Sequence, residues 1–179
     1  LYELTTENTF TKIPHHLGTT HLEFIVPLKV ATDPRTSRAL HSHMRLKSKI
    51  VAKYSAHQVL DDLGDHLESL VKQELRANGL TNIQKNARSY KGRSWTRTGH
   101  DLDFVADHPT GEAFGVEVKN ELGEIDSVEF STKLEMCEYL GLRPIFIVRY
   151  LPWSLTPRVR DQGGYVITLG NQIYPLGYR

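Results

Sequence analysis

Two acidic residues and a lysine lie close together in the segment GHDLDFVADHPTGEAFGVEVKN, which spans residues 99 to 120. They are Asp103, Glu117 and Lys119. Carboxylate oxygens suit Mg²⁺ or Mn²⁺, which keep several waters and take one or two protein carboxylates plus substrate phosphate. A lysine beside the ion can orient or help deprotonate a water, while the metal offsets charge on phosphate oxygens. These residue types therefore suit phosphodiester hydrolysis.

The same segment predicts a β-hairpin. Residues 101–106 and 113–119 are strand-like, and the sequence His-Pro-Thr-Gly between them is a strong turn signal. A three-residue loop over 109–111, with its glycine in the left-handed conformation, pairs residues whose numbers sum to 220. This register places Asp103 opposite Glu117.

Strand alternation then sorts the hairpin side chains onto two faces. One face is charged, with Asp101, Asp103, Glu117 and Lys119, and the other is apolar, with Leu102, Phe104, Val116 and Val118. Two carboxylates directly opposed across a ladder repel each other. A shared divalent cation would relieve that repulsion, so we expect the charged face to be a metal site.

The elements around the hairpin predict an α/β fold. Leucines and valines at spacings of three and four indicate a helix over residues 55–78, with Ser55 as its N-cap, and a second amphipathic helix covers 126–140. Short strands are expected at residues 80–87 and 144–150, and a last hairpin at 164–175. The order helix, strand, strand, strand, helix, strand predicts a mixed sheet flanked by helices.

Residues 1–55 are interpreted as an N-terminal extension, and residues 56–179 as the core of one compact domain. Residues 21–30 are plausible as a strand, which Pro27 would bend or place at an edge. The stretch from 31 to 53 predicts a basic helix or arm, because it contains few acidic residues and six cations. These are Arg35, Arg38, Arg45, Lys47, Lys49 and Lys53.

Composition excludes several classes of protein. Hydrophobic residues make up 39% of the 179 and charged residues 24%, which is ordinary for a globular protein and argues against extensive disorder. The single cysteine, Cys137, excludes a disulfide framework and a cysteine-based zinc cluster. No segment has the roughly 20 apolar residues of a membrane span, so we expect a soluble cytoplasmic protein. The net charge of +1 over the whole chain does not by itself indicate binding to nucleic acid.

Asp103 followed by Glu117-Val118-Lys119 resembles the D…ExK signature of the PD-(D/E)xK nuclease superfamily, which includes restriction endonucleases and archaeal Holliday-junction resolvases. The resemblance covers roughly residues 60 to 150 and implies a restriction-endonuclease-like core. In the resolvases, a glutamate of the first helix helps bind metal. The resemblance therefore implies Glu68, Asp103 and Glu117 as ligands of Mg²⁺ or Mn²⁺, and Lys119 as the catalytic lysine.

The chain also departs from the family pattern. Leu102 stands where the name-giving motif has proline. The helix after the lysine often carries a glutamine in resolvases, whereas Ser131, Thr132 and Lys133 occur here, so that role has no candidate. Within the predicted helix 55–78, Glu74 competes with Glu68 for the metal-site role, because it lies near the middle of the apolar stripe.

The loop before the hairpin predicts contact with DNA. It interleaves cations with aromatics and can neutralise phosphates and stack on bases or sugars. The residues are Lys85, Arg88, Tyr90, Lys91, Arg93, Trp95 and Arg97. The alternative is an ordinary solvated loop.

The sequence thus predicts a metal-dependent DNA endonuclease, and three alternatives remain. The same chemistry could act on branched or single-stranded DNA or on RNA. The chain could be a non-catalytic, nucleic-acid-binding subunit of a larger DNA-processing complex. It could also be a structural domain whose hairpin charges are solvated. Many members of the superfamily cut duplexes as homodimers, so the resemblance also implies a homodimer.

Overall fold

The computed structural model describes residues 9–17, 20–54, 56–121, 123, 125–175 and 177. The chain divides into two compact units, Leu1–Leu60 and Asp61–Arg179. None of the helices in these ranges combines the length and apolarity that a membrane span requires.

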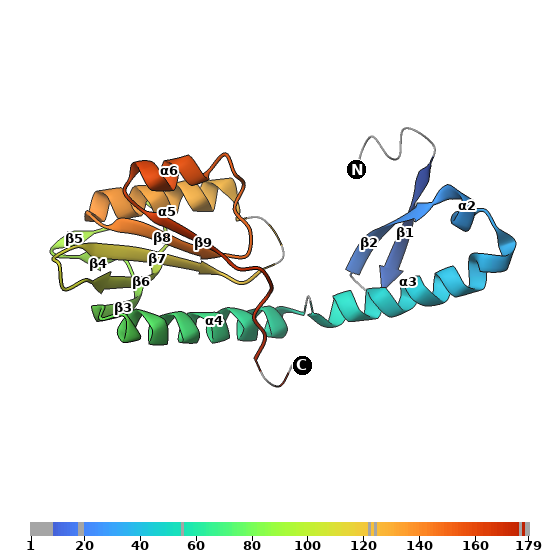
Figure 1. Cartoon of the computed structure of the whole chain (residues 1–179), viewed down its shortest axis with the longest axis horizontal. Helices are drawn as coiled ribbons and strands as arrows, with labels where there is room; N and C mark the ends of the chain where they lie inside the picture. The colour runs from blue at the N-terminus through green and yellow to red at the C-terminus, as the bar shows by residue number, and fades with distance from the viewer. Residues whose placement is uncertain are drawn as a thin grey trace. The chain divides into compact units, whose positions relative to one another are not determined.

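The first unit is a β-hairpin packed against a helix (Figure 1). Strands β1 (Phe10–Leu17) and β2 (Thr20–Pro27) pair antiparallel, and α2 (Leu28–Ala31) leads to the long helix α3 (Pro34–Tyr54). The strand expected over 21–30 is therefore β2, which ends at its proline. Strand β1 was not predicted, and the basic stretch is helical over 34–53.

The second unit is a five-stranded mixed sheet between helices. Its strands are β3 (Thr81–Ala87), β6 (Leu102–Asp107), β7 (Ala113–Lys119), β8 (Arg143–Val148) and β9 (Tyr165–Thr168). They lie in that order across the sheet. The first three strands are antiparallel, and β7, β8 and β9 are parallel.

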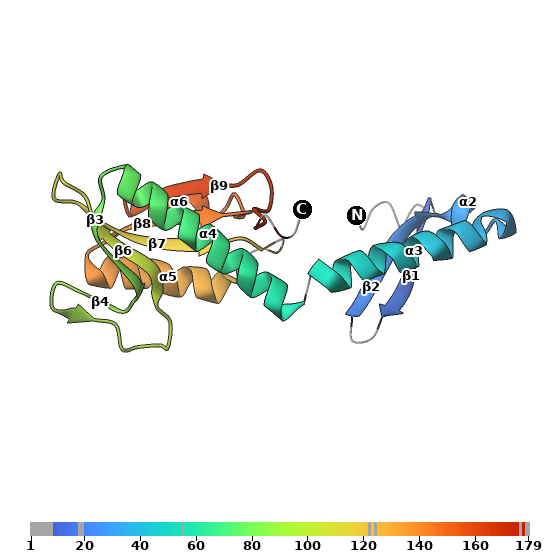
Figure 2. The ribbon, with the colours of Figure 1, turned by 90° about the horizontal axis from the view of Figure 1, so that it is seen from below.

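Helices cover both faces of this sheet (Figures 1 and 2). Helix α4 (His57–Ala77) lies along one face, and α5 (Ser127–Leu140) with the short α6 (Thr156–Asp161) lies on the other. The predicted mixed sheet flanked by helices is confirmed, as is the order helix, strand, strand, strand, helix, strand from α4 to β8. The small hairpin of β4 (Ser89–Tyr90) and β5 (Arg93–Ser94) lies within the loop before β6.

Local sequence sets the ends of the two main helices. The Asp126 carboxylate accepts hydrogen bonds from the first backbone N–H groups of α5, and Gly141 ends that helix in the left-handed conformation with φ of 73°. Gly79, with φ of 82°, follows α4 in the same way. The predicted N-cap Ser55 lies outside the described residues.

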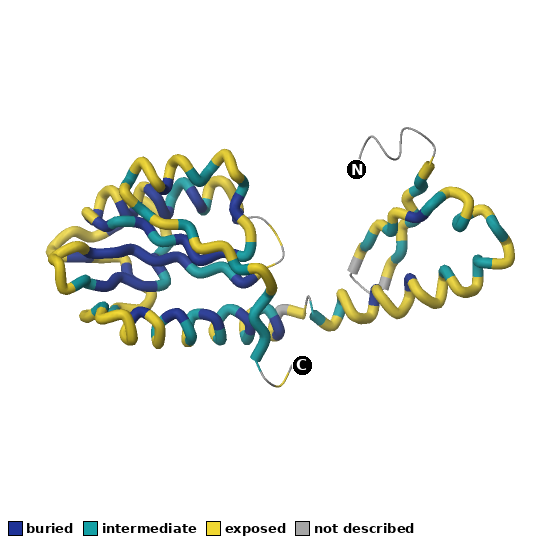
Figure 3. Tube along the Cα trace, viewed as in Figure 1, coloured by how far each residue is buried: buried dark blue, intermediate teal, exposed yellow. Residues whose placement is uncertain are grey.

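Three apolar clusters hold the helices against the sheet, one on the α4 face and two on the α5 face, and Figure 3 shows the buried residues along β6, β7 and β8. On the α4 face, Leu67, Val71 and Leu75 pack against Phe104, Phe114, Val116 and Ile147. On the α5 face, the residues are Leu102, Val105, Met136, Cys137 and Leu140, continued by Phe130, Leu134 and Phe146. Burial of this apolar area is the main stabilising contribution to the unit.

The predicted C-terminal hairpin over 164–175 is wrong. Strand β9 pairs parallel with β8, and residues 171–175 form no strand. The buried side chain of Asn120 provides the physical reason, since it binds both backbone groups of Ile173. Its Nδ2 donates to the Ile173 oxygen at 2.6 Å, and its Oδ1 accepts from the Ile173 nitrogen at 3.0 Å. Asn120 thus replaces the partner strand that a hairpin would supply.

Candidate active site

The hairpin that carries the predicted site has the predicted register. Partners run from Phe104 with Val116 to Asp107 with Ala113, so each pair sums to 220. Gly111 has φ of 93°, in the left-handed region expected of the loop. The turn is closed by the His108 N–H, which donates to the Glu112 carbonyl at 2.8 Å.

The predicted alternation fails at one residue. Leu102 was expected beside Phe104, but it packs in the α5 cluster, whereas Phe104 packs against α4. Its pairing partner on β3, Ala87, lies in the same α5 cluster. Asn86, next to that partner, has φ of 52° and interrupts the regular strand there, a conformation that asparagine tolerates better than most residues.

Asp103 lies at this irregular point of β6 and turns its carboxylate towards the end of β7. Its Oδ2 accepts a hydrogen bond from the Val118 backbone N–H at 2.7 Å. Burial, with a smaller contribution from repulsion by the carboxylates of Glu68 and Asp101, raises the pKa of Asp103 to about 6. The Val118 N–H and the ammonium of Lys133 oppose it.

Glu117 is the most buried of the predicted catalytic residues, with 4% of its surface exposed. Burial, together with repulsion from Asp103, raises its pKa to about 8, as expected for two acids from adjoining strands. Its Oε2 accepts a hydrogen bond from Lys133 Nζ at 2.7 Å, which acts in the opposite direction. Asp103 and Glu117 therefore form a close pair of carboxyl groups in a largely water-excluded position.

Lys133 is a site residue that the sequence analysis did not assign. It extends from α5, is only 5% exposed, and also donates to the Asp101 carbonyl at 2.5 Å. A signal for it existed, because Lys133 falls at helical spacing with the buried positions Phe130, Leu134 and Cys137. A cation on a core-facing stripe requires a buried partner, and Glu117 supplies the carboxylate.

Lys119 occupies the end of β7, as predicted, but its ammonium binds elsewhere. Its Nζ lies 3.1 and 2.9 Å from the two carboxylate oxygens of Glu129 on α5, and 3.9 Å from Glu121. Burial disfavours the ammonium, yet the bonds with Glu129 outweigh it and raise the pKa of Lys119. The amine is therefore protonated at neutral pH.

Glu68 reaches towards the same region from α4, and its carboxylate contributes to the raised pKa of Asp103. Its Oε2 is buried and lies 2.8 Å from Lys85 Nζ, an ion pair without a well-aligned hydrogen bond. Lys85, expected to contact DNA, is thus paired with Glu68 and, at 3.6 Å, with Asp65. The competing helix residue, Glu74, is exposed.

The donor set fits a magnesium-type ion in part. Within the described residues, no three His, Cys, Asp or Glu side chains are arranged to hold a metal ion. Asp103 and Glu117 nevertheless each accept a hydrogen bond at one carboxylate oxygen, Oδ2 and Oε2, and their other oxygens, Oδ1 and Oε1, could take a ligand. Two carboxylates plus waters and phosphate are a usual Mg²⁺ environment, and a cation between them would relieve the repulsion described above.

The predicted DNA-binding loop is only partly available to a ligand. Trp95 and Tyr90 are buried, at 3% and 9% exposure, so the expectation that they stack on bases is wrong. Trp95 packs edge-on to Tyr139, and its Nε1 donates to Thr98 Oγ1. These aromatics anchor the loop to α5, because burial of their large apolar surfaces stabilises the folded protein.

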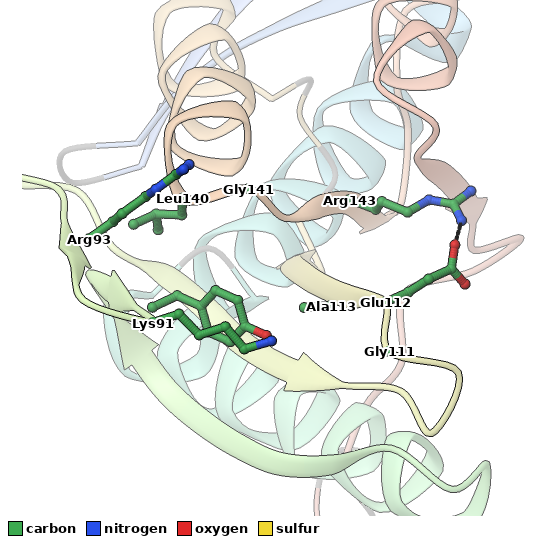
Figure 4. Close-up of a pocket in the computed structure, with 9 residues that line it drawn as sticks. Lys91, Arg93, Gly111, Glu112, Ala113, Leu140, Gly141 and Arg143 are labelled. Carbon is green, nitrogen blue, oxygen red and sulfur yellow. Dashed lines mark hydrogen bonds and ion pairs between the residues drawn. The ribbon is translucent and has the colours of Figure 1, made fainter.

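The exposed residues of the predicted DNA-binding set are Lys85, Lys91 and the three arginines. Arg88 donates to the Gly99 carbonyl, and Arg97 lies 5.2 Å from the ring of Trp95. Lys91 and Arg93 line a pocket of about 470 Å³ with the ion pair of Glu112 and Arg143 (Figure 4).

This pocket is at the turn end of the hairpin, whereas Lys119 lies six residues from Ala113, about 20 Å away along β7. The pocket is therefore separate from the paired carboxyl groups.

No protein-family model matches this chain, and no curated protein sequence matches it. Two solved structures resemble it in fold: a repair endonuclease from Pyrococcus abyssi, at 14% identity and a TM-score of 0.44, and EndoMS in complex with dsDNA, at 15% and 0.38. Each alignment covers 60% of this chain and 46% of the other, less than half of that protein. Both TM-scores are below 0.5.

Proposed function

We propose that this protein is a metal-dependent nuclease that hydrolyses DNA phosphodiester bonds. One observation carries the proposal: the carboxyl groups of Asp103 and Glu117 converge from neighbouring strands, with the Lys133 ammonium 2.7 Å from Glu117. A domain selected only for stability gains nothing from burying two acids whose ionisation is mutually unfavourable. Perturbed acids of this kind cluster at functional sites.

Asp103 and Glu117 would hold one Mg²⁺ or Mn²⁺ through their remaining oxygens, with Glu68 as a further ligand or as a general base. The ion, when bound, supplies charge stabilisation on the phosphate and a more acidic water. Because Lys85 pairs with Glu68, release of that lysine to the substrate backbone would free the glutamate. The N–H of Val118 fixes the orientation of the Asp103 carboxylate in either case.

The two lysines would act as fixed positive charges. A protonated amine cannot accept a proton, so Lys119 would orient a water or offset charge on a phosphate oxygen rather than act as a general base. Lys133 would keep Glu117 oriented and reduce the cost of its ionisation. By resemblance to the superfamily, the products would carry 5′-phosphate and 3′-hydroxyl ends, and the active form would be a homodimer.

The test is a cleavage assay on plasmid, linear duplex, single-stranded and four-way-junction DNA and on RNA, with Mg²⁺ or with EDTA. We expect magnesium-dependent cleavage that is lost in Asp103→Asn and reduced at least a hundredfold in Lys119→Ala and in Lys133→Met. A matched control is Arg160→Ala, which removes an exposed cation of α6 and should leave cleavage unchanged.

Three results would contradict this proposal. The first is absence of cleavage under all conditions, and the second is cleavage that persists in EDTA. The third is cleavage that survives Asp103→Asn. Binding of DNA without cutting would instead identify a nucleic-acid-binding module. Comparison of the DNA and RNA substrates gives the substrate class directly.

A further inference from the structure

Helix α3 of the first unit carries an unusual excess of positive charge. Residues 34–54 contain six lysines and arginines and no aspartate or glutamate. Over residues 9–54 the count is eight cations against two acids, Glu23 and Asp33. The charge of the whole chain is close to neutral, so this excess is a local property of one unit.

Helical geometry gathers most of these cations onto one face. At 100° per residue, five of the six fall within an arc of about 80°. They form a basic stripe of five residues, Arg35, Arg38, Arg45, Lys49 and Lys53. Lys47 is the exception and lines the apolar groove between α3 and β2.

The basic stripe is turned away from the interior of its unit. The buried residues of α3 are Met44 and Ser48, whose directions are centred about 120° from the middle of the stripe. All five stripe residues are exposed, and Figure 3 shows α3 as mainly exposed along its length. The hairpin of β1 and β2 therefore covers one side of the helix, and the cations occupy another.

Most of the stripe is not neutralised within its own unit. Arg35 pairs with Asp33 at 3.0 Å, and Glu23 pairs with Lys12 on the hairpin. Among the residues that the structure describes, Arg38, Arg45 and Lys49 have no ion pair. Keeping several like charges together on one face is unfavourable unless a polyanion shares the surface.

We propose that the basic stripe binds the phosphate backbone of duplex DNA. This inference rests on the proposed function for its ligand and extends it by naming a second contact surface outside the carboxylate site. The stripe extends over 19 residues, from Arg35 to Lys53, about 27 Å along the helix axis, which is comparable with eight base pairs of B-DNA. Because the cations would meet phosphates rather than base edges, the contact should be independent of sequence.

An anionic membrane is the competing ligand. Leu46 and Ile50 are exposed next to the stripe, at 56% and 44%. A helix that inserts into a bilayer interface requires a broad apolar face, usually with aromatic residues, and two aliphatic side chains do not provide one. The charge pattern without such a face favours DNA.

The experiment measures binding of the full chain to a labelled 20-base-pair duplex in EDTA, by fluorescence anisotropy at several salt concentrations. The test variant is Arg45→Gln/Lys49→Gln. The control is Lys29→Gln/Lys47→Gln, which removes the same charge from the same unit outside the stripe. Thermal unfolding of each variant checks that the fold is retained.

We expect the test variant to bind at least tenfold more weakly at 50 mM salt. The slope of log K against log salt should become shallower by about two, because each lost phosphate contact removes roughly 0.9. The control should change neither value appreciably. Equal loss in both variants, no binding by the unmodified protein, or stripe-dependent binding to vesicles of phosphatidylserine and phosphatidylcholine without DNA binding would each overturn the inference.

These outcomes are separable from those of the nuclease proposal, since binding is measured where cleavage is blocked. If the unmodified protein cleaves DNA but the test variant keeps its salt slope, the role of the basic stripe in DNA binding is rejected and the nuclease proposal stands. If the test variant has a shallower salt slope but the unmodified protein cleaves no DNA in Mg²⁺, DNA binding by the basic stripe is supported and the nuclease proposal is rejected.

Discussion

The substitution Glu117→Gln tests whether the buried carboxyl pair is as unfavourable as its surroundings indicate. Burial and the Asp103 carboxylate raise the pKa of Glu117 from 4.5 to about 8. The folded state therefore binds a proton more tightly than the unfolded state. Stability from this group is fully present below pH 4.5 and is lost as the pH rises through 8. Glutamine resembles the protonated acid and does not titrate.

Between pH 5.5 and 8.5, this linkage predicts that the unmodified protein loses roughly 3 kcal/mol of unfolding free energy from Glu117 alone. The variant should lose correspondingly less. At pH 8.5 without metal it should be the more stable of the two proteins, despite the charge it removes from Lys133. The measurement is urea denaturation in EDTA at both pH values.

A matched control is Glu135→Gln, which alters an exposed glutamate of α5. It should retain the pH dependence of the unmodified protein. If Glu117→Gln shows the same loss of stability between the two pH values as the unmodified protein, Glu117 is already ionised at pH 5.5. The ion pair with Lys133 would then dominate over burial, and the argument for a strained carboxyl pair would be refuted.

Three further predictions concern metal binding and packing. Mg²⁺ should raise the melting temperature more at pH 8.5 than at pH 6, because Glu117 is ionised only at the higher pH; an equal shift at both would contradict a site on this residue. Trp95→Ala should lower the free energy of unfolding, measured by urea denaturation, by about 3–5 kcal/mol, since the ring is buried. If the variant instead loses DNA affinity at unchanged stability, Trp95 contacts DNA as first predicted. Gly115→Ala should cost roughly 1–3 kcal/mol, because its methyl group would lie 2.6 Å from Cys137 Sγ; unchanged thermal unfolding would show that α5 can move aside.

Sequence alone determined the parts of this protein that depend on neighbours along the chain. The turn at residues 109–111 fixed the register of the hairpin, because a short loop leaves few ways to pair its strands. The capping residues Asp126 and Gly141 likewise set the ends of α5. The position of Lys119 at the end of β7 was equally predictable, since strand bounds follow from residue type and turn signals.

Tertiary structure alone decided which partners these residues meet. Helix α5 crosses the sheet, so Lys133 reaches Glu117 from 16 residues away, while Glu129 takes the ammonium of Lys119. The burial of Trp95 likewise depends on contact with Tyr139, far along the chain. Local pattern states which side chains are charged or apolar, but the packing of distant elements selects their partners, because burial and ion pairing act through space rather than along the sequence.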